Sequence, residues 1–191
     1  MGHQIGHRIE GQVPRLETDR LVLRGRRLDD FDACAEMWSL MDTVRYISGV
    51  PRTREETWKR FLSNIGHWPA IGYGYWAVAD KATDRLIGEM GFLHSKRDAM
   101  VTAESAPLAA YPEAGWALHP SVHGTGRARE AMTAVLEWAD RVANFPTTVC
   151  AITHDNAASI RLADQLGYKQ VTRIPWGDTE SLIYRRERPS S

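Results

Sequence analysis

The chain has few cysteines and no excess of charge of either sign. Its 191 residues include 2 cysteines, and 24 basic side chains balance 24 acidic ones. Cys34 and Cys150 stand in apolar stretches at no spacing typical of a metal site, so we expect two reduced core thiols, no metal and a cytoplasmic location. A balanced charge provides no general attraction to nucleic acid or to anionic membranes, and we expect neither as a partner.

Long apolar runs and targeting segments are also missing. No stretch has the length and apolar character of a membrane-spanning helix, and Met1-Gly2 is not followed by the Ser or Thr at position six that myristoylation requires. We expect residues 1–13 to form a flexible tail. Residues 14–188 should form one α/β domain, because 43% hydrophobic content suits a sizeable core and no linker or repeat divides the chain.

Two glycines stand between a predicted strand and a long amphipathic pattern. Gly124 and Gly126 remove Cβ atoms that would keep a ligand away from the backbone. Apolar residues then recur at spacings of three and four from Ala128 to Val142, which predicts a helix with one buried face. The N–H groups of residues 125–128 would point away from the start of that helix, so the turn predicts an anion-binding site.

Two common phosphate-binding loops do not fit this turn. A dinucleotide loop needs a third Gly or Ala where Arg129 stands, and the chain lacks the Gly-Lys-Ser/Thr of a Walker loop. The turn resembles instead the acyl-coenzyme A loop of the GNAT acetyltransferases, Gln/Arg-x-x-Gly-x-Gly/Ala, although its first position is a His. The resembling residues are His123, Gly124, Thr125, Gly126, Arg127 and Ala128. A helix-entry turn that binds nothing is the alternative.

A second segment resembles the same family. After a predicted buried strand at residues 148–152, the sequence HDNAASIRLADQLGY is similar to the family's Asn-x-x-Ser … Leu-Gly-Phe/Tyr pattern. The matching residues are Asn156, Ser159, Leu162, Leu166, Gly167 and Tyr168. Asp155 or Asn156 would cap a helix that Gly167 ends.

The N-terminal half agrees with this resemblance. Residues 18–24, TDRLVLR, resemble the opening strand of the branch that acetylates ribosomal-protein N-termini. Thr53 and Glu56 form a predicted capping box, and we expect the helix that they begin to end at Gly66. The resemblance covers residues 14–186. It implies the α/β (α+β) GNAT fold, with a mixed central sheet of about seven strands splayed between strands 4 and 5 and about four flanking helices.

The resemblance also assigns the binding of acetyl-CoA. It implies that strand 114–118 splays from strand 148–152 and that the pantetheine arm lies between them, bonded to the backbone near Trp116 and Leu118. The pyrophosphate would then reach loop 123–128, where His123 could donate an N–H group and, when protonated, add a charge. Binding by the backbone N–H groups alone is the alternative. Asn156 would hold the pantetheine.

The candidates for the acid differ from those of many family members. Many carry a Tyr where this chain has Ala163, so Ser159 is the candidate hydrogen-bond donor to the departing thiolate. A thiol with a pKa near ~8.5 leaves with little help, so the loss is tolerable. The alternative is that the Ser159 hydroxyl merely bonds a carbonyl of its own helix.

The general base has several candidates. An amine must lose its proton to attack a thioester, and Glu113, at the start of the splayed strand, could accept this proton directly or through water. Glu89, Glu104 and His119 are rivals, and a plain surface role for Glu113 stays open.

The resemblance implies an acetyl-CoA-dependent N-acetyltransferase. Its acceptor would be the primary amine of a protein N-terminus or of a small molecule, and the protein could be a monomer or a homodimer. The alternative is a non-catalytic acyl-CoA-binding or sensing protein. We expect residues 95–112 to border the acceptor cleft or to form surface decoration. The aromatic residues of segment 64–76 would line an amine pocket or pack in the core.

Overall fold

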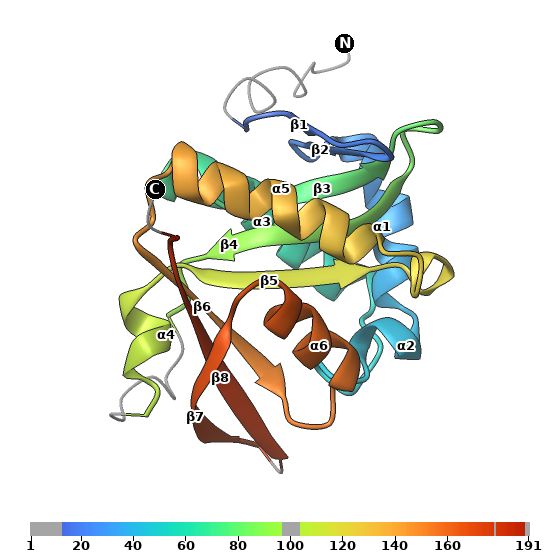
Figure 1. Ribbon diagram of the computed structural model, residues 1–191. Coiled ribbons are helices and arrows are strands. Elements are labelled where there is room, and N and C mark those ends of the chain that lie inside the picture. The colour runs from blue at the N-terminus through green and yellow to red at the C-terminus, as the bar shows by residue number, and fades with distance from the viewer. Residues whose placement is uncertain (1–12, 97–103, 178, 190–191) are drawn as a thin grey trace.

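The protein folds around one mixed sheet, shown in Figure 1. The computed structural model describes residues 13–96, 104–177 and 179–189. Within them, eight strands run in the order β1-β2-β3-β4-β5-β6-β8-β7. The strands are β1 (Leu16–Glu17), β2 (Leu21–Arg24), β3 (Tyr75–Asp80), β4 (Leu86–Leu93), β5 (Glu113–Leu118), β6 (Thr147–Thr153), β7 (Lys169–Trp176) and β8 (Thr179–Glu187).

Six α-helices accompany the sheet in the described residues. They are α1 (Phe31–Trp38), α2 (Met41–Val44), α3 (Arg54–Ile71), α4 (Ala106–Ala110), α5 (Arg127–Arg141) and α6 (Ala157–Gln165). The predicted fold class is confirmed, but the predicted numbers of strands and helices were too low. Strand β1 has 2 residues and helices α2 and α4 have 4 and 5 residues, which is too short for a periodic sequence signal.

The predicted splay of the sheet is confirmed between β5 and β6. These two strands run parallel but pair only at Glu113 and Val149. Beyond that pair β5 follows β4, whereas β6 follows β8 through seven residue pairs, so the two strands diverge (Figure 1). The sheet therefore has a gap at its centre.

Separate hydrophobic clusters cover the two faces of the first half of the sheet. The apolar face of α5 packs on one face, where Trp138 meets Trp76 edge to face at 5.0 Å and Trp68 packs beside them. Helices α1 and α3 pack on the other face around Trp38 and Phe61. In Figure 1, α5 lies in front of the sheet, and α1 and α3 lie behind it. Of the two roles expected for the aromatic segment 64–76, Trp68 and Trp76 therefore have the second, which is packing in the core.

The ends of the chain lie largely outside the described residues. The predicted tail covers residues 1–13, of which residues 1–12 are not described and Val13 is buried in the α5-side core. Among the described residues, none of the helices combines the length and the apolar character that crossing a bilayer requires.

Helix α3 shows where a local signal misled the sequence prediction. Its capping box at Thr53 and Glu56 is confirmed, but the helix continues through Gly66 and ends at Gly72, whose φ is 86°. Trp68 is buried two residues beyond Gly66 and packs against the core. Burial of this indole outweighs the cost of about 1 kcal/mol for a glycine inside a helix.

Alanine at these two glycines should change stability in opposite directions. We expect Gly66→Ala to raise the free energy of unfolding by about 0.5–1 kcal/mol, because it removes backbone entropy and its new Cβ meets no atom within 4 Å. Gly72→Ala should lower it by about 1 kcal/mol, because a Cβ disfavours a left-handed residue. Urea unfolding of both variants measures the difference, and a gain at both positions would contradict this assignment.

Candidate active site

The gap in the sheet exposes one backbone edge of β5. The N–H of His119 donates to the C=O of Ile87 at 2.8 Å on the β4 side, and the N–H of Val149 donates to the C=O of Pro112 at 3.1 Å on the β6 side. Because successive residues of a strand direct their N–H and C=O groups to opposite edges, Trp116 and Leu118 direct theirs toward the gap. On this β6 side, no described strand pairs with β5 at these two residues.

The gap opens into a pocket of about 210 Å³, called the central pocket below. Its walls come from β5, β6 and α6 on one side and from α1, α3 and the segment after α2 on the other. Trp176 and Ser181, from the final hairpin, also line it. The remaining residues are Trp38, Tyr46, Ile47, Arg60, Tyr75, Leu93, Glu113, Ala114, Gly115, Trp116, Ala117, Cys150, Ala151, Ile152, Thr153, Asn156 and Ser159.

Glu113 lies at the closed end of the gap, at the single residue pair between β5 and β6. Its side chain is buried and lines the central pocket, and its Oε2 accepts a hydrogen bond of 2.6 Å from the Ser95 hydroxyl. Because this side chain is buried, Glu113 does not have the plain surface role that the sequence left open. The position puts a carboxylate at the point where the two strands begin to separate.

The other candidate bases occupy different surroundings. Glu104 lies beside Pro107 and Val171 on another surface, and His119 accepts a hydrogen bond from the N–H of Ser121 through its Nδ1. Neither Glu104 nor His119 lines the central pocket. Glu104 therefore lies apart from the opened edge of β5, whereas His119 directly follows this edge but is not a lining residue of the pocket.

Glu89 is buried in an ionic cluster between β4 and the α1–α3 layer. Its carboxylate accepts from Arg26 at 2.5 Å and from Arg60, and the Trp38 indole N–H lies 3.4 Å away. Burial alone would raise the pKa of Glu89, but the charges of Arg26 and Arg60 outweigh this effect and lower it to about 2. A carboxylate with so low a pKa is a weak base.

Asn156 and Ser159 begin α6 on the far side of the gap. Asn156 is confirmed as the helix cap, because its Oδ1 accepts from the N–H of Ser159 at 3.1 Å. The Trp116 indole N–H donates to the Ser159 hydroxyl oxygen at 3.1 Å and so connects β5 with α6. Among the described residues the Ser159 hydroxyl donates to no carbonyl, which leaves its proton for a ligand.

The glycine-rich turn carries a row of available donors. Among the described residues, no acceptor faces the backbone N–H groups of residues 124–129, and α5 has no side-chain cap. Gly124 and Gly126 have φ values of 71° and 79°, which explains why glycine stands at both positions. This arrangement suits an anion with several oxygen atoms.

His123 contacts the strand before the turn. Its Nε2 lies 2.9 Å from the C=O of Leu118, and because a carbonyl only accepts, Nε2 carries the proton of this bond. In the neutral ring Nδ1 is then an acceptor, which does not suit an anion. His123 thus ties the turn to β5 and offers a donor to an anion only when protonated.

Side chains from the opening strand hold the other end of the turn. Thr18 donates to Glu130 at 2.6 Å, and the Arg20 guanidinium bonds both Glu130 at 2.7 Å and the C=O of Thr125 at 3.0 Å. Sequence reasoning did not assign these two residues to the turn. Their only signal was the TDRLVLR motif itself, which therefore has a structural explanation in the support of the first turn of α5.

Trp38 and Arg60 have no sequence signal as pocket residues, whereas Tyr75 belongs to the aromatic segment 64–76, which we expected to line a pocket or pack in the core. Trp38, Arg60 and Tyr75 come from α1, α3 and β3 and meet only in the folded chain. Tyr75 also explains Gly115, since a Cβ at that position would lie 1.8 Å from the Tyr75 hydroxyl. Residues 95–96 and 104–112, the described part of the long link, do not line the central pocket. Helix α4 packs instead on β6 and β8 through Leu108.

Comparison with known proteins identifies the family. Residues 20–169 match the model of the acetyltransferase (GNAT) domain. The chain belongs to the GNAT acetyltransferase family. It is 25% identical over 156 residues to a Bacillus licheniformis protein named uncharacterized N-acetyltransferase p20, with 81% of this chain and 82% of that protein covered.

Solved structures share the GNAT fold. An acetyltransferase from Agrobacterium tumefaciens is 29% identical, with a TM-score of 0.76 over 91% of this chain and 94% of that one. RimL, a ribosomal L7/L12 α-N-protein acetyltransferase solved with coenzyme A, has a TM-score of 0.74 at 16% identity, with 91% of this chain and 98% of that one covered. At that identity the likeness shows the fold.

The Glu89 cluster makes stability depend on pH. Because the pKa of Glu89 is lowered from 4.5 to about 2, its stabilisation is present above about pH 4.5 and is lost as the pH falls through about 2. We expect Glu89→Gln to lower the free energy of unfolding at neutral pH by about 3 kcal/mol, and the difference from wild type to shrink below about pH 4. Urea unfolding at neutral and at acidic pH measures this difference. The variant Glu137→Gln, at an exposed position, is the control. A constant difference would contradict the cluster's ionisation.

Proposed function

We propose that this GNAT protein is an N-acetyltransferase that transfers the acetyl group of acetyl-CoA to a primary amine, of a protein N-terminus or a small molecule. The amine would attack the thioester directly. One observation carries the proposal: the N–H groups of residues 124–129 have no acceptor in the described part of the chain, and they lie in the turn that follows a strand whose open edge borders a pocket. Family membership supports the same activity.

The residues present fit acetyl-CoA. The N–H groups at the start of α5 would hold the pyrophosphate, with Arg127 and Ala128 at the helix entry. The backbone of Trp116 and Leu118 would bond the pantetheine amides as an added strand would. Asn156 uses Oδ1 as the helix cap and keeps its Nδ2 group for the same arm. Bound acetyl-CoA supplies the activated acetyl group.

Glu113 is the proposed general base. It would take a proton from the acceptor's ammonium group and leave the neutral amine that attacks. Its place at the closed end of the gap supports this role, because the acetyl end of a molecule lying along β5 would approach it. Glu89 is the weaker candidate because two arginines stabilise its ionised form.

Ser159 is the proposed donor to the departing sulfur. Trp116 occupies one lone pair of its oxygen and so directs the hydroxyl proton elsewhere. One donor suffices because a thiolate is a good leaving group. The buried free thiols of Cys34 and Cys150 suit a reducing compartment, and a cytoplasmic location is part of the proposal.

A thiol-release assay over a panel of amines tests the function. Release of free coenzyme A that depends on an acceptor supports an enzyme. Tight binding of acetyl-CoA without release for any acceptor would instead support an acyl-CoA-binding or sensing protein.

Removing the proposed base should affect turnover and its pH dependence. We expect Glu113→Gln to lower kcat about 100-fold near neutral pH with little change in coenzyme affinity. The remaining rate should rise as the pH increases, because more acceptor amine is already neutral. Glu104→Gln is the matched control, since Glu104 lies outside the pocket. An unchanged kcat in Glu113→Gln would show that Glu113 is not the general base.

Removing the Ser159 hydroxyl should separate chemistry from binding. We expect Ser159→Ala to reduce kcat about 10-fold, because the sulfur loses one hydrogen bond, while the Kd for acetyl-CoA changes less than about 3-fold. Steady-state kinetics and calorimetry measure the two quantities. Ser63→Ala, an exposed serine on α3, provides the control. An unchanged kcat would overturn the proposed donor role.

A further inference from the structure

The central pocket presents one cationic and one anionic side chain. Among its described lining residues, Arg60 and Glu113 are the charged ones, and the others are apolar, aromatic or neutral polar. Arg60 comes from the α3 wall and Glu113 from the start of β5. The proposed function uses Glu113 and leaves Arg60 without a role.

Arg60 has N–H groups that no acceptor among the described residues uses. Its Nη2 donates to Glu89, whereas its Nε is buried without a partner, and its Nη1 has no acceptor among the described residues. The side chain is 25% exposed, and its guanidinium lies 4.5 Å from the centre of the Trp38 ring. A cation that keeps free N–H groups at the wall of a pocket gains most from an ionised acceptor.

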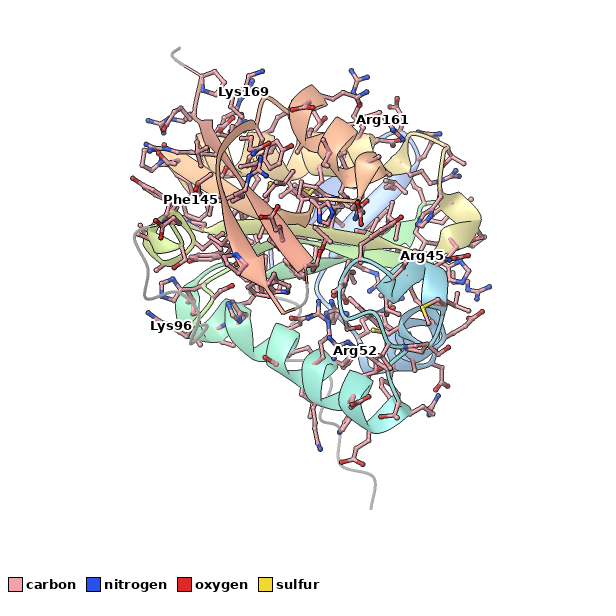
Figure 2. All side chains as sticks on the ribbon, turned by 90° about the horizontal axis from the view of Figure 1, so that it is seen from below. Arg45, Arg52, Lys96, Phe145, Arg161 and Lys169 are labelled. Carbon is pink, nitrogen blue, oxygen red and sulfur yellow. The ribbon has the colours of Figure 1, made fainter. Side chains whose placement is uncertain are left out.

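The charges around Arg60 do not balance. The single carboxylate of Glu89 is shared by Arg26 and Arg60, so two positive charges meet one negative charge and one positive charge is left. Arg52 adds another guanidinium 5.4 Å from the centre of the Trp38 ring. In Figure 2, Arg45 and Arg52 lie on the side of the molecule that carries α2, away from Lys96 and Phe145. A largely buried excess charge favours a bound anion.

Tyr75 connects the two charged walls of the pocket. Its ring centre lies 5.8 Å from the Arg60 guanidinium, and its hydroxyl meets the backbone at Gly115, two residues from Glu113 on β5. Residues two apart on a strand are about 7 Å apart and point to the same face. Arg60 and Glu113 therefore face one small volume from opposite sides of one tyrosine.

We infer that the acceptor is a small molecule that carries a carboxylate close to its amine. This inference rests on the proposed function and names its substrate class. The amine lies at Glu113, and the carboxylate accepts from the Nη1 group of Arg60. Trp38 and Tyr75 pack against the body of the molecule. A polyamine or an amino sugar would instead place a second positive charge against Arg60.

The test compares amino acids with their own carboxamides in a thiol-release assay on the full chain. The two members of each pair share the α-amine and the side chain, and the carboxamide lacks the negative charge. We expect kcat/KM to favour the carboxylate by about 10-fold or more, since a charged hydrogen bond contributes about 1.5–3 kcal/mol. Arg60→Met should remove this preference through KM, so that the carboxylate and the carboxamide of each pair are used with similar kcat/KM. Arg60→Lys should restore part of it.

Arg52→Met is the matched control, because Arg52 contacts the same Trp38 ring but does not line the pocket. It should keep the preference. Calorimetry with the amino acid alone provides a readout independent of turnover, and we expect binding to wild type that weakens about 10-fold in Arg60→Met.

Three outcomes would overturn the inference: a wild-type preference for carboxamides, polyamines or acidic peptides, a preference retained by Arg60→Met, or no binding of any amino acid. Absence of thiol release with every amine would instead overturn the proposed function. Amino acid binding that depends on Arg60 would in that case still support the carboxylate site.

Discussion

The organisation of the molecule depends on the loss of backbone pairing between β5 and β6 after one residue pair. Both strands are anchored on their outer sides, β5 by β4 and β6 by β8, so neither can turn to restore the ladder. The backbone groups of Trp116 and Leu118 then face a gap in the middle of the sheet. A ligand with amide groups can take the place of the missing strand, so the defect in the sheet supplies a binding surface.

The turn after β5 extends this surface in a straight path. A row of N–H groups stands at the start of α5, and its position is set by contacts from both sides: His123 bonds Leu118, while Thr18 and Arg20 bond Glu130 in the first helical turn. One end of the path therefore suits an anion, and the other ends at the carboxylate of Glu113. An anion at the start of α5 and the Glu113 carboxylate would therefore lie at opposite ends of one strand and its turn.

The α1–α3 layer forms the other wall of the pocket and also contains charged side chains. Arg26 and Arg60 share Glu89, which keeps that carboxylate ionised and makes it a poor base. The same pairing leaves positive charge beside the pocket. The pairing of one buried acid thus makes Glu89 a poor base and places a cationic side chain at the pocket wall.

Local patterns in the sequence were enough for the helix α5, the capping box at Thr53 and the cap at Asn156, because each depends on residues a few positions apart. The splayed GNAT fold followed from the resemblance of the sequence motifs to that family. Only the tertiary structure decided that α3 passes Gly66, since the buried Trp68 contacts partners far along the chain. It also decided that Glu89 is paired, that Glu104 and His119 lie elsewhere, and that Arg60 meets Tyr75 at the pocket. Burial and ion pairing depend on neighbours that are distant in sequence, so a short motif cannot indicate them.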